Sequence, residues 1–390
     1  MQEVFKRASI LYEIASFEEQ AQLKAGDTVH RPYRSSIKPQ TYTRGTAVTI
    51  RDITDTDETL QVATAKVVPF YVDDLDELQT NYKTANEYAD DASIELQNFI
   101  DGDVLGEYSN ATSKVDDVEI NGGTAGNAFV LGVGNVQKVF VQAKLKIRKQ
   151  HIKWKKGQLF AAISPEFEGV LMDYLAGKES ALGDSTGVAG HIGHYMGFDL
   201  YVSDSVGWSA DLQMGSACTA GDTITINGVV LTAAASPTAA GEFDVEVSAA
   251  AQITTLVTSI NAPGTSVSGE FVALSAANQD LLVGITATDG TTKISLKAEG
   301  WGTVVVSETL TAAADIWTLN KQIQHQLFGK KGAVDVVIQA KPKLVVKDVP
   351  DKLGKNFLPY TLYGLKTFTE GKKKLVDVRV QSDQFTASAS

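Results

Sequence analysis

Residues 72–102 read VDDLDELQTNYKTANEYADDASIELQNFIDG, and their apolar members recur at alternating steps of three and four. This spacing lines one face of an α-helix. Carboxylates favour the positive end of a helix dipole and glycine often ends a helix, so the acidic start at Asp73, Asp74 and Glu77 and the later Gly102 mark the boundaries. The pattern predicts one helix over 73–101, roughly 43 Å long at 1.5 Å per residue, which a lone compact domain seldom needs.

Length, charge and cysteine content limit the class of protein. A chain of 390 residues predicts two or three domains. It carries 47 acidic and 35 basic residues, and the net charge of −12 argues against tight wrapping of nucleic acid. With Cys218 as the only cysteine, neither an internal disulfide nor a cysteine-based zinc site is expected, and Cys218 is predicted to be a small buried residue. No signal peptide and no apolar run long enough for a membrane span are present, so no membrane partner is expected.

The segments before the predicted helix have little apolar material of their own. Residues 1–25 are predicted to form a short amphipathic helix followed by a loose arm. Residues 26–72 consist of extended, Val- and Thr-rich stretches separated by polar turns, which predicts a long β-hairpin. Because its tip segments carry few large apolar residues, this hairpin is expected to need a neighbouring chain for burial.

The segments after the helix alternate helix and strand signals. Asn135 is predicted to cap a helix that ends near His151, residues 157–164 form a buried strand, and Ser164 with Pro165 starts a helix closed by Gly177. A strand at 197–206 follows. After residue 317 a succession of strands leads to a C-terminal tail over 381–390.

Residues 209–316 have a composition of their own, dense in Ala, Thr, Ser and Gly. Between Ala210 and Ile316 eleven acidic residues face two lysines, which accounts for −9 of the net −12. Alternating strands, one helix and a type I′ turn signal at Asn227 and Gly228 predict a small β-rich domain inserted into a host. Trp208 and Trp317 flank it.

No motif in the sequence gives strong support for catalysis, cofactor binding or metal binding. The sequence HIGH at His191–His194 lacks the partner motif of a tRNA synthetase, and Asp199 alone could join its histidines around a metal. Gly132 and Gly134 form half of a dinucleotide fingerprint without the surrounding strand-helix-strand unit. The chain is therefore expected not to be an enzyme, with no catalytic residues, no cofactor and no metal.

A basic run at 144–156 surrounds Trp154 and could contact phosphates. A solvated helix face, or a contact with acidic groups such as Asp90 and Asp91 of a neighbour, is the favoured interpretation of such a run. Its members are Lys144, Lys146, Arg148, Lys149, Lys153, Lys155 and Lys156.

Several segments, taken in order, resemble the major capsid proteins of tailed bacteriophages, which have the Hong Kong 97-type α+β fold. The segments are GDTVHRP at 26–32, YTRGT at 42–46, FYVDDLDELQ at 70–79, LFAAISPEFEGVLMDYL at 159–175 and GFDLYVSDSV at 197–206.

The resemblance implies a division of the whole chain. It comprises an N-terminal arm at 1–25, an E-loop hairpin at 26–72, a P domain at 73–157 with its spine helix at 73–101, an A domain at 158–208 and 317–368, the β-rich insert at 209–316, a C-terminal strand at 369–380 returning to the P domain, and the tail at 381–390.

The implied function is that of a coat subunit that assembles into hexamers and pentamers of an icosahedral head, made in the bacterial cytoplasm, around double-stranded DNA. The expected partners are other copies of the chain, scaffolding, portal and decoration proteins, and DNA through weak non-specific contact. An encapsulin-like compartment is the alternative within the fold, and a tail or adhesin protein is an alternative outside it. The residues expected at contacts between subunits are Arg31, Tyr33, Arg34, Tyr42, Arg44, Asp73, Asp74 and Glu77.

Overall fold

The computed structural model describes residues 9–21, 28–34, 39–48, 50, 55–73, 84–178, 193–299, 302–312, 322–349 and 353–382. The chain divides into two compact units. Unit 1 comprises Met1–Glu13, Asn98–Lys331 and Lys373–Ser390, and unit 2 comprises Ile14–Gln97 and Gly332–Lys372. Of the helices that the structure describes, none combines the length and apolarity that a membrane crossing requires.

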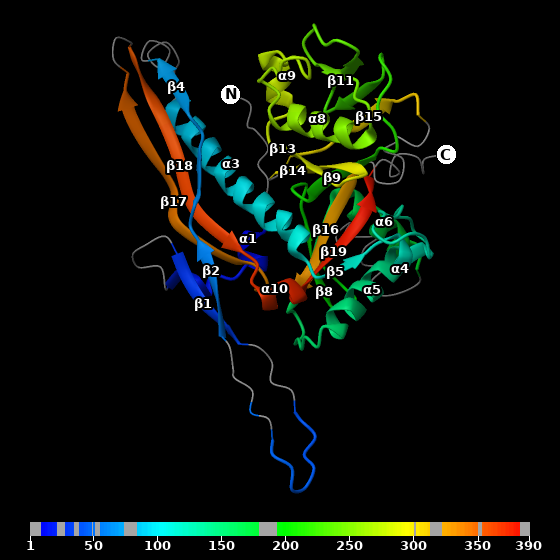
Figure 1. The fold of residues 1–390 in the computed structure, drawn as a ribbon. Coiled ribbons are helices and arrows are strands. Elements are labelled where there is room, and N and C mark those ends of the chain that lie inside the picture. The colour runs from blue at the N-terminus through cyan, green and yellow to red at the C-terminus, as the bar shows by residue number, and fades with distance from the viewer. Residues whose placement is uncertain are drawn as a thin grey trace. The chain divides into compact units, whose positions relative to one another are not determined.

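Unit 2 is built on two long antiparallel strands (Figure 1). A four-stranded sheet pairs β17 with β18, and β18 also pairs with the short strands β3 and β4. A separate two-stranded hairpin, β1 with β2, has Val29 opposite Leu60. The strand bounds are β1 Thr28–Arg34, β2 Asp55–Gln61, β3 Thr64–Val67, β4 Phe70–Asp73, β17 Asp335–Asp348 and β18 Gly354–Lys366. The short helical turn η1 covers Glu18–Ala21 in unit 2, whereas α1 Leu11–Ile14 and α10 Thr369–Lys374 each include residues of both units.

Unit 1 contains a nine-stranded sheet in the order β13-β14-β9-β16-β6-β8-β7, with β19 pairing β16 and β5. Its inner strand β6, between β16 and β8, is buried at every position, as the apolar run LFAAI predicts. The strands are β5 Ser113–Val115, β6 Leu159–Ile163, β7 His194–Tyr195, β8 Phe198–Val202, β9 Gly207–Gln213, β13 Ile285–Asp289, β14 Lys293–Ala298, β16 Ile323–Lys330 and β19 Leu375–Gln381. The helical pieces are η2 Glu107–Asn110, α4 Asp117–Asn121, α5 Val136–Lys149 and α6 Pro165–Ala176.

Local sequence chemistry explains the helices that cover this sheet. Ser164 accepts a hydrogen bond from the backbone N–H of Phe167, and Pro165 occupies the first turn of α6, as predicted. Helix α5 buries its periodic apolar face against the core. That face consists of Val136, Val139, Phe140, Ala143 and Ile147.

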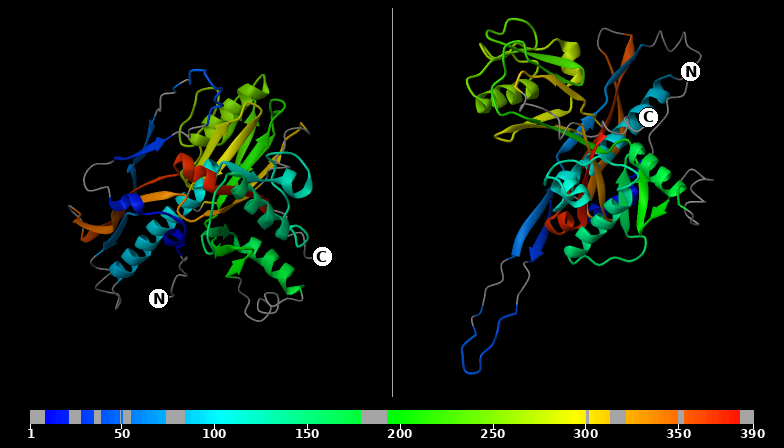
Figure 2. Two further views of the ribbon diagram at one scale, coloured as in Figure 1. Left: turned by 90° about the horizontal axis from the view of Figure 1, so that it is seen from below. Right: turned by 90° about the vertical axis from the view of Figure 1, so that its right-hand side faces the viewer.

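The inserted segment forms a second, four-stranded sheet in the order β12-β11-β10-β15. Asn227 and Gly228 both have positive φ, 49° and 83°, between the paired ends of β10 and β11, which confirms the predicted type I′ turn. Helix α8 packs on β13 (Figures 1 and 2). Cys218 lies buried in the apolar core of this region, as expected. The bounds are β10 Thr223–Ile226, β11 Val229–Ala234, β12 Glu242–Asp244, α8 Ala249–Asn261, α9 Ala276–Leu281 and β15 Val306–Thr309.

The inserted segment also extends the host sheet. The expected boundary at residue 209 falls inside β9, which pairs with β16 on one side and with β14 on the other. Strand β13 then pairs with β14. A change in composition therefore marks the segment, but the backbone hydrogen bonds cross from host to insert without a break.

The long helix departs from its predicted bounds at both ends. Asp73 ends strand β4, where it pairs with Gly354 of β18, so it does not lie in a helical turn. Helix α3 is described over Thr84–Gly106 and passes through Gly102. The apolar stripe continues at Val104 and Leu105, which are both buried, and this explains why the helix does not end at the glycine.

Candidate functional site: assembly surfaces and a buried polar cluster

The base of the β1-β2 hairpin is anchored in unit 2. Val29 of β1 and Leu60 of β2 are buried together with Val62, Val337 and Phe368. The expectation that the hairpin has little to fold against in its own chain is therefore wrong for its base. The small apolar cluster arises from residues more than 270 positions apart, so local sequence patterns could not show it.

The tip of the hairpin has no such anchor among the described residues. Residues 39–48 and residue 50 are all exposed. Tyr42, Val48 and Ile50 are large apolar side chains with exposures of 64%, 58% and 92%. The tip is therefore a candidate surface for contact with another protein chain, because burial of these apolar side chains away from water is favourable.

Two of the expected contact residues bind within unit 2. Arg31 Nη1 lies 3.3 Å from Asp335 Oδ2, and its guanidinium lies 5.0 Å from the ring centroid of Phe368. The Tyr33 hydroxyl lies 3.3 Å from Glu370 Oε1. Both side chains are thus engaged in their own unit, and their role in contacts between subunits stays a prediction.

The other expected contact residues are scattered. Tyr42 and Arg44 lie in the exposed tip. The Tyr71 hydroxyl lies 3.3 Å from Asp73 Oδ2 at the end of β4. Arg34 ends β1, but its side chain lies outside the described set, as do residues Asp74 and Glu77. The structure therefore does not bring the eight residues together into one site.

The described part of the N-terminal arm, residues 9–21, makes hydrogen bonds at two places, so this part is not the loose segment that was expected. In unit 1, Asp101 accepts hydrogen bonds from the Ser9 hydroxyl at 2.9 Å and the Ile10 N–H at 3.0 Å. In unit 2, the Gln20 side chain both donates to the carbonyl and accepts from the N–H of Ile338. Burial raises the pKa of Asp101 to about 6.

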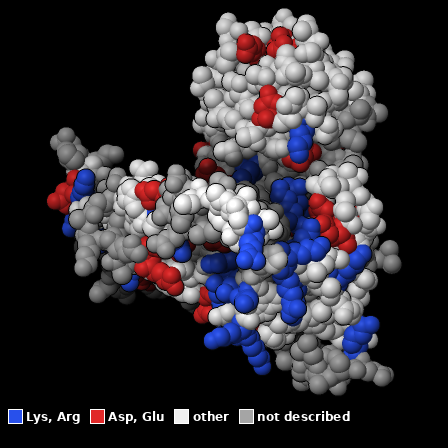
Figure 3. Space-filling model, turned by 60° about the horizontal axis from the view of Figure 1, so that its bottom comes forward, with Lys and Arg blue, Asp and Glu red and all other residues white. Residues whose placement is uncertain are grey.

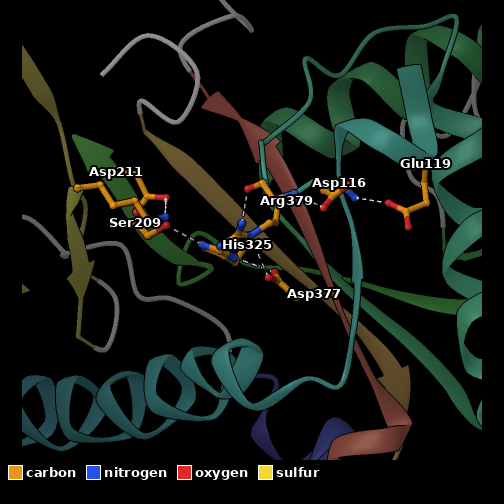
Figure 4. Close-up of polar contacts among 9 residues, drawn as sticks. Asp116, Glu119, Ser209, Asp211, His325, Asp377 and Arg379 are labelled. Carbon is orange, nitrogen blue, oxygen red and sulfur yellow. Dashed lines mark hydrogen bonds and ion pairs between the residues drawn. The ribbon is translucent and has the colours of Figure 1, made fainter. Parts of the chain in front are cut away.

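A buried polar cluster crosses the centre of the unit 1 sheet (Figure 4). His325 of β16 lies between two partners, with Nε2 2.7 Å from Ser209 Oγ on β9 and Nδ1 2.7 Å from Asp377 Oδ1 on β19. Arg379 Nε lies 3.4 Å from the other oxygen of Asp377. The Tyr108 ring stacks on the imidazole at a centroid distance of 3.7 Å.

The chemistry of the partners determines the proton positions. An ionised carboxylate only accepts hydrogen bonds, so Nδ1 of His325 carries the proton that faces Asp377. Nε2 is then an acceptor, and the Ser209 hydroxyl donates to it. Burial lowers the pKa of His325, and the nearby Asp377 carboxylate opposes that shift.

This Ser-His-Asp order matches that of a hydrolytic triad, but the surroundings do not support catalysis. His325 and Asp377 are buried, and Tyr108 covers the imidazole. A cavity of about 280 Å³ nearby is lined by Trp208 and Gln324. Side chains alternate between the two faces of a sheet, and Trp208 and Gln324 are the chain neighbours of Ser209 and His325. The cavity therefore lies on the opposite face of the sheet from the polar cluster. The cluster is a structural connection among β9, β16 and β19.

The sequence patterns missed this cluster, although a signal was present. In β16 all residues from Ile323 to Gly329 are buried, including Gln324, His325 and Gln326. Polar residues inside an otherwise strand-like run, together with Asp377 in a Val-rich strand, indicate buried hydrogen-bond partners. Sequence alone does not show which of them pair.

Of the residues considered for a metal site, His194 and Asp199 lie beside the side chain of Lys331, whose ammonium group pairs with Asp199. His194 Nδ1 lies 3.0 Å from Asp199 Oδ1, while Lys331 Nζ lies 2.9 Å from the other oxygen of Asp199. His191 lies outside the described residues. Within the described ranges, no group of three His, Cys, Asp or Glu side chains could hold a metal ion.

Comparisons with known proteins identify the fold. Neither a scan of family models nor a search of curated proteins gives a match. A solved structure from Mycobacterium phage Che8 aligns with a TM-score of 0.58 at 12% identity, covering 97% of this chain and 93% of that chain. The capsid of cyanophage P-SCSP1u gives 0.52 at 11% identity over 98% and 91%. The capsid of a native GTA particle gives 0.51 at 7% identity over 98% and 93%. The chain therefore has the Hong Kong 97-type fold of bacteriophage major capsid proteins.

Proposed function

We propose that this protein is the major capsid subunit of a tailed phage, assembling as hexamers and pentamers into an icosahedral head that encloses double-stranded DNA. The role is structural, not enzymatic. The observation that carries the proposal is the combination of the capsid fold with an exposed hairpin tip. The fold shared with capsid structures supports a role as a capsid protein, and the exposed apolar tip provides a surface for binding another subunit.

Burial of the apolar tip residues would contribute free energy to association between subunits. Val48 and Ile50 are 58% and 92% exposed. Complete burial of such a side chain stabilises a complex by roughly 1.5–3 kcal/mol. A modest contact of this kind, repeated at every subunit, gives a stable shell while each single contact stays reversible enough for correction during assembly.

The remaining partners and the domain roles belong to the same proposal. The arm, hairpin and long helix correspond to the N-arm, E-loop and spine of the fold, and the inserted segment faces outward on the A domain. Scaffolding, portal and decoration proteins are the expected additional partners. Assembly takes place in the host cytoplasm, and the mature location is the virion.

Electron microscopy of the expressed full-length protein tests the proposal. We expect closed shells or capsomers from the wild-type chain, and their loss in the double variant Val48→Ser, Ile50→Ser. The matched control is Val247→Ser, Val283→Ser, because these two apolar side chains of the insert are 98% and 78% exposed. The control should assemble normally.

Either of two outcomes, or the formation of fibres, would overturn the proposal. One is a wild-type protein that remains monomeric by sedimentation, with amides of residues 39–48 protected from hydrogen exchange. The other is a shell that contains protein cargo in place of DNA, which would indicate an encapsulin-like compartment. Fibres would instead indicate a tail component.

A further inference from the structure

Positive charge is concentrated in one segment of an acidic chain. Between Glu119 and Glu166 the sequence contains eight Lys or Arg and no Asp or Glu. Since the whole chain has a net charge of −12, the remainder carries −12 − 8 = −20. Lys and Arg side chains gather in the middle of the face shown in Figure 3, whereas the insert at the top shows only scattered charges.

Local structure accounts for part of this charge. Lys146 forms an ion pair with Glu119, and Lys144 Nζ donates to the carbonyl of Met196 at 2.9 Å. Basic residues in the last turn of α5 also complement the negative end of the helix dipole. These lysines therefore serve the fold.

The dipole does not explain Lys153, Lys155 and Lys156, which lie beyond the end of α5 at Lys149. These three lysines are exposed, as are Arg148 and Lys149 in the last turn of α5, and we call residues 148–156 the basic segment. Within the described part of the chain, the four lysines of this segment have no ion pair closer than 4.0 Å.

The basic segment is nevertheless held in place. Its Trp154 packs against the unit 1 core, and the Arg148 guanidinium lies 5.1 Å from the Trp154 ring centroid. Lys330 Nζ donates to the carbonyl of Lys153 at 3.0 Å. The apolar side chains thus point inward, while the ammonium groups project into solvent from an anchored backbone.

We infer that the basic segment binds the phosphate backbone of the enclosed DNA, an inference that rests on the proposed function. Protein interfaces are depleted in lysine and enriched in aromatic and apolar residues, whereas non-specific DNA contacts are made mainly by Lys and Arg to phosphates. The exposed side chains of this segment are basic or polar and contribute no apolar anchor. Its chemistry therefore favours DNA over an acidic segment of a neighbouring subunit.

Fluorescence anisotropy of a labelled duplex of about 30 base pairs with purified full-length protein tests the inference. Counterion release makes log K fall with log salt by roughly 0.9 per phosphate contact. We expect the triple variant Lys153→Gln, Lys155→Gln, Lys156→Gln to bind roughly tenfold or more weakly, with a slope shallower by about 3. The matched control replaces Lys341, Lys343 and Lys347, three exposed lysines of β17, by Gln and should retain affinity.

Three results would overturn the inference. They are no duplex binding by the wild-type protein, equal losses in the triple variant and the control, or a triple variant that folds but forms no shells, which would assign the segment to a contact with an acidic neighbour. Electron microscopy separates this from the proposed function. Shells from wild-type and variant chains that hold equal amounts of DNA would refute the role of the segment alone, while absence of wild-type shells would refute the capsid proposal.

Discussion

His325 Nδ1 lies 2.7 Å from Asp377 Oδ1 inside the unit 1 sheet, and Arg379 Nε approaches the other carboxylate oxygen at 3.4 Å. Asp377→Asn would place an amide N–H beside one of these donors and leave the Arg379 charge without its partner. We expect a loss of about 3–5 kcal/mol in the free energy of unfolding, measured by urea denaturation. The control Asp280→Asn, at an exposed position of α9, should change it by less than about 0.5 kcal/mol. A near-neutral Asp377→Asn would contradict the proposed structural role.

The same histidine should make stability depend on pH. Its pKa is lowered in the folded chain by burial, so the unfolded chain binds the proton more readily. The stability that His325 contributes to the folded chain is therefore fully present above the ordinary histidine pKa of about 6.5, and it is lost as the pH falls below that value. Relative to His325→Gln, the wild-type protein should lose up to about 2 kcal/mol between about pH 7 and pH 5 in urea unfolding. A constant difference between the two proteins over this range would rule out a buried neutral histidine.

Asp101 should change the free energy of unfolding with pH in the opposite direction from His325. Burial raises its pKa from 3.8 to about 6, so the folded chain holds the proton more tightly. The stability that Asp101 contributes to the folded chain is fully present below about pH 4 and is lost as the pH rises through about 6. Relative to Asp101→Asn, the wild-type protein should gain about 1 kcal/mol between about pH 7 and pH 5. Parallel stability curves for the two proteins would mean that the carboxyl is well solvated.

Only glycine fits at position 207, because the Tyr108 ring lies against its backbone. A Cβ at this position would lie 2.2 Å from Tyr108 Cε1. Gly207→Ala should therefore displace Tyr108 from His325 and cost about 1–3 kcal/mol in thermal or urea unfolding. Gly134→Ala is the control, because a Cβ there meets nothing within 4 Å. In the double variant Gly207→Ala, Tyr108→Leu, the smaller side chain at position 108 removes the clash and should recover part of the lost stability. Strict additivity of the two free-energy changes would argue against the clash.

The outward placement of the insert can be tested with an epitope in its exposed loop at 235–240. We expect an antibody to bind this epitope in intact particles. The same epitope placed after Lys156 should be reached only when particles are opened, because the basic segment is proposed to face DNA. An epitope at 235–240 that stays inaccessible until disruption would place the insert inside the shell or between capsomers.

Local chemistry predicted the elements that depend on neighbouring residues. The cap at Ser164, the apolar face of α5 and the turn at Asn227 and Gly228 each follow from a few adjacent positions. The order of such segments was also sufficient for the resemblance to capsid proteins. These features could be predicted because sequence and structure are related within one or two turns of chain.

The remaining features depend on long-range pairing. Asp73 was expected to begin a helix, but pairing of β4 with the distant β18 places it in a strand. The anchored hairpin base and the partners of His325 likewise join residues from distant segments. Periodicity gives a residue's face and its burial, but it does not give the strand that lies opposite.

The continuous sheet from β13 through β14 and β9 to β16 has a mechanical consequence. A pull on the insert directed along these strands would load many backbone hydrogen bonds at once in shear, and not one after another as in unzipping. A force applied to the insert would therefore be transmitted directly to β16 in the core of unit 1.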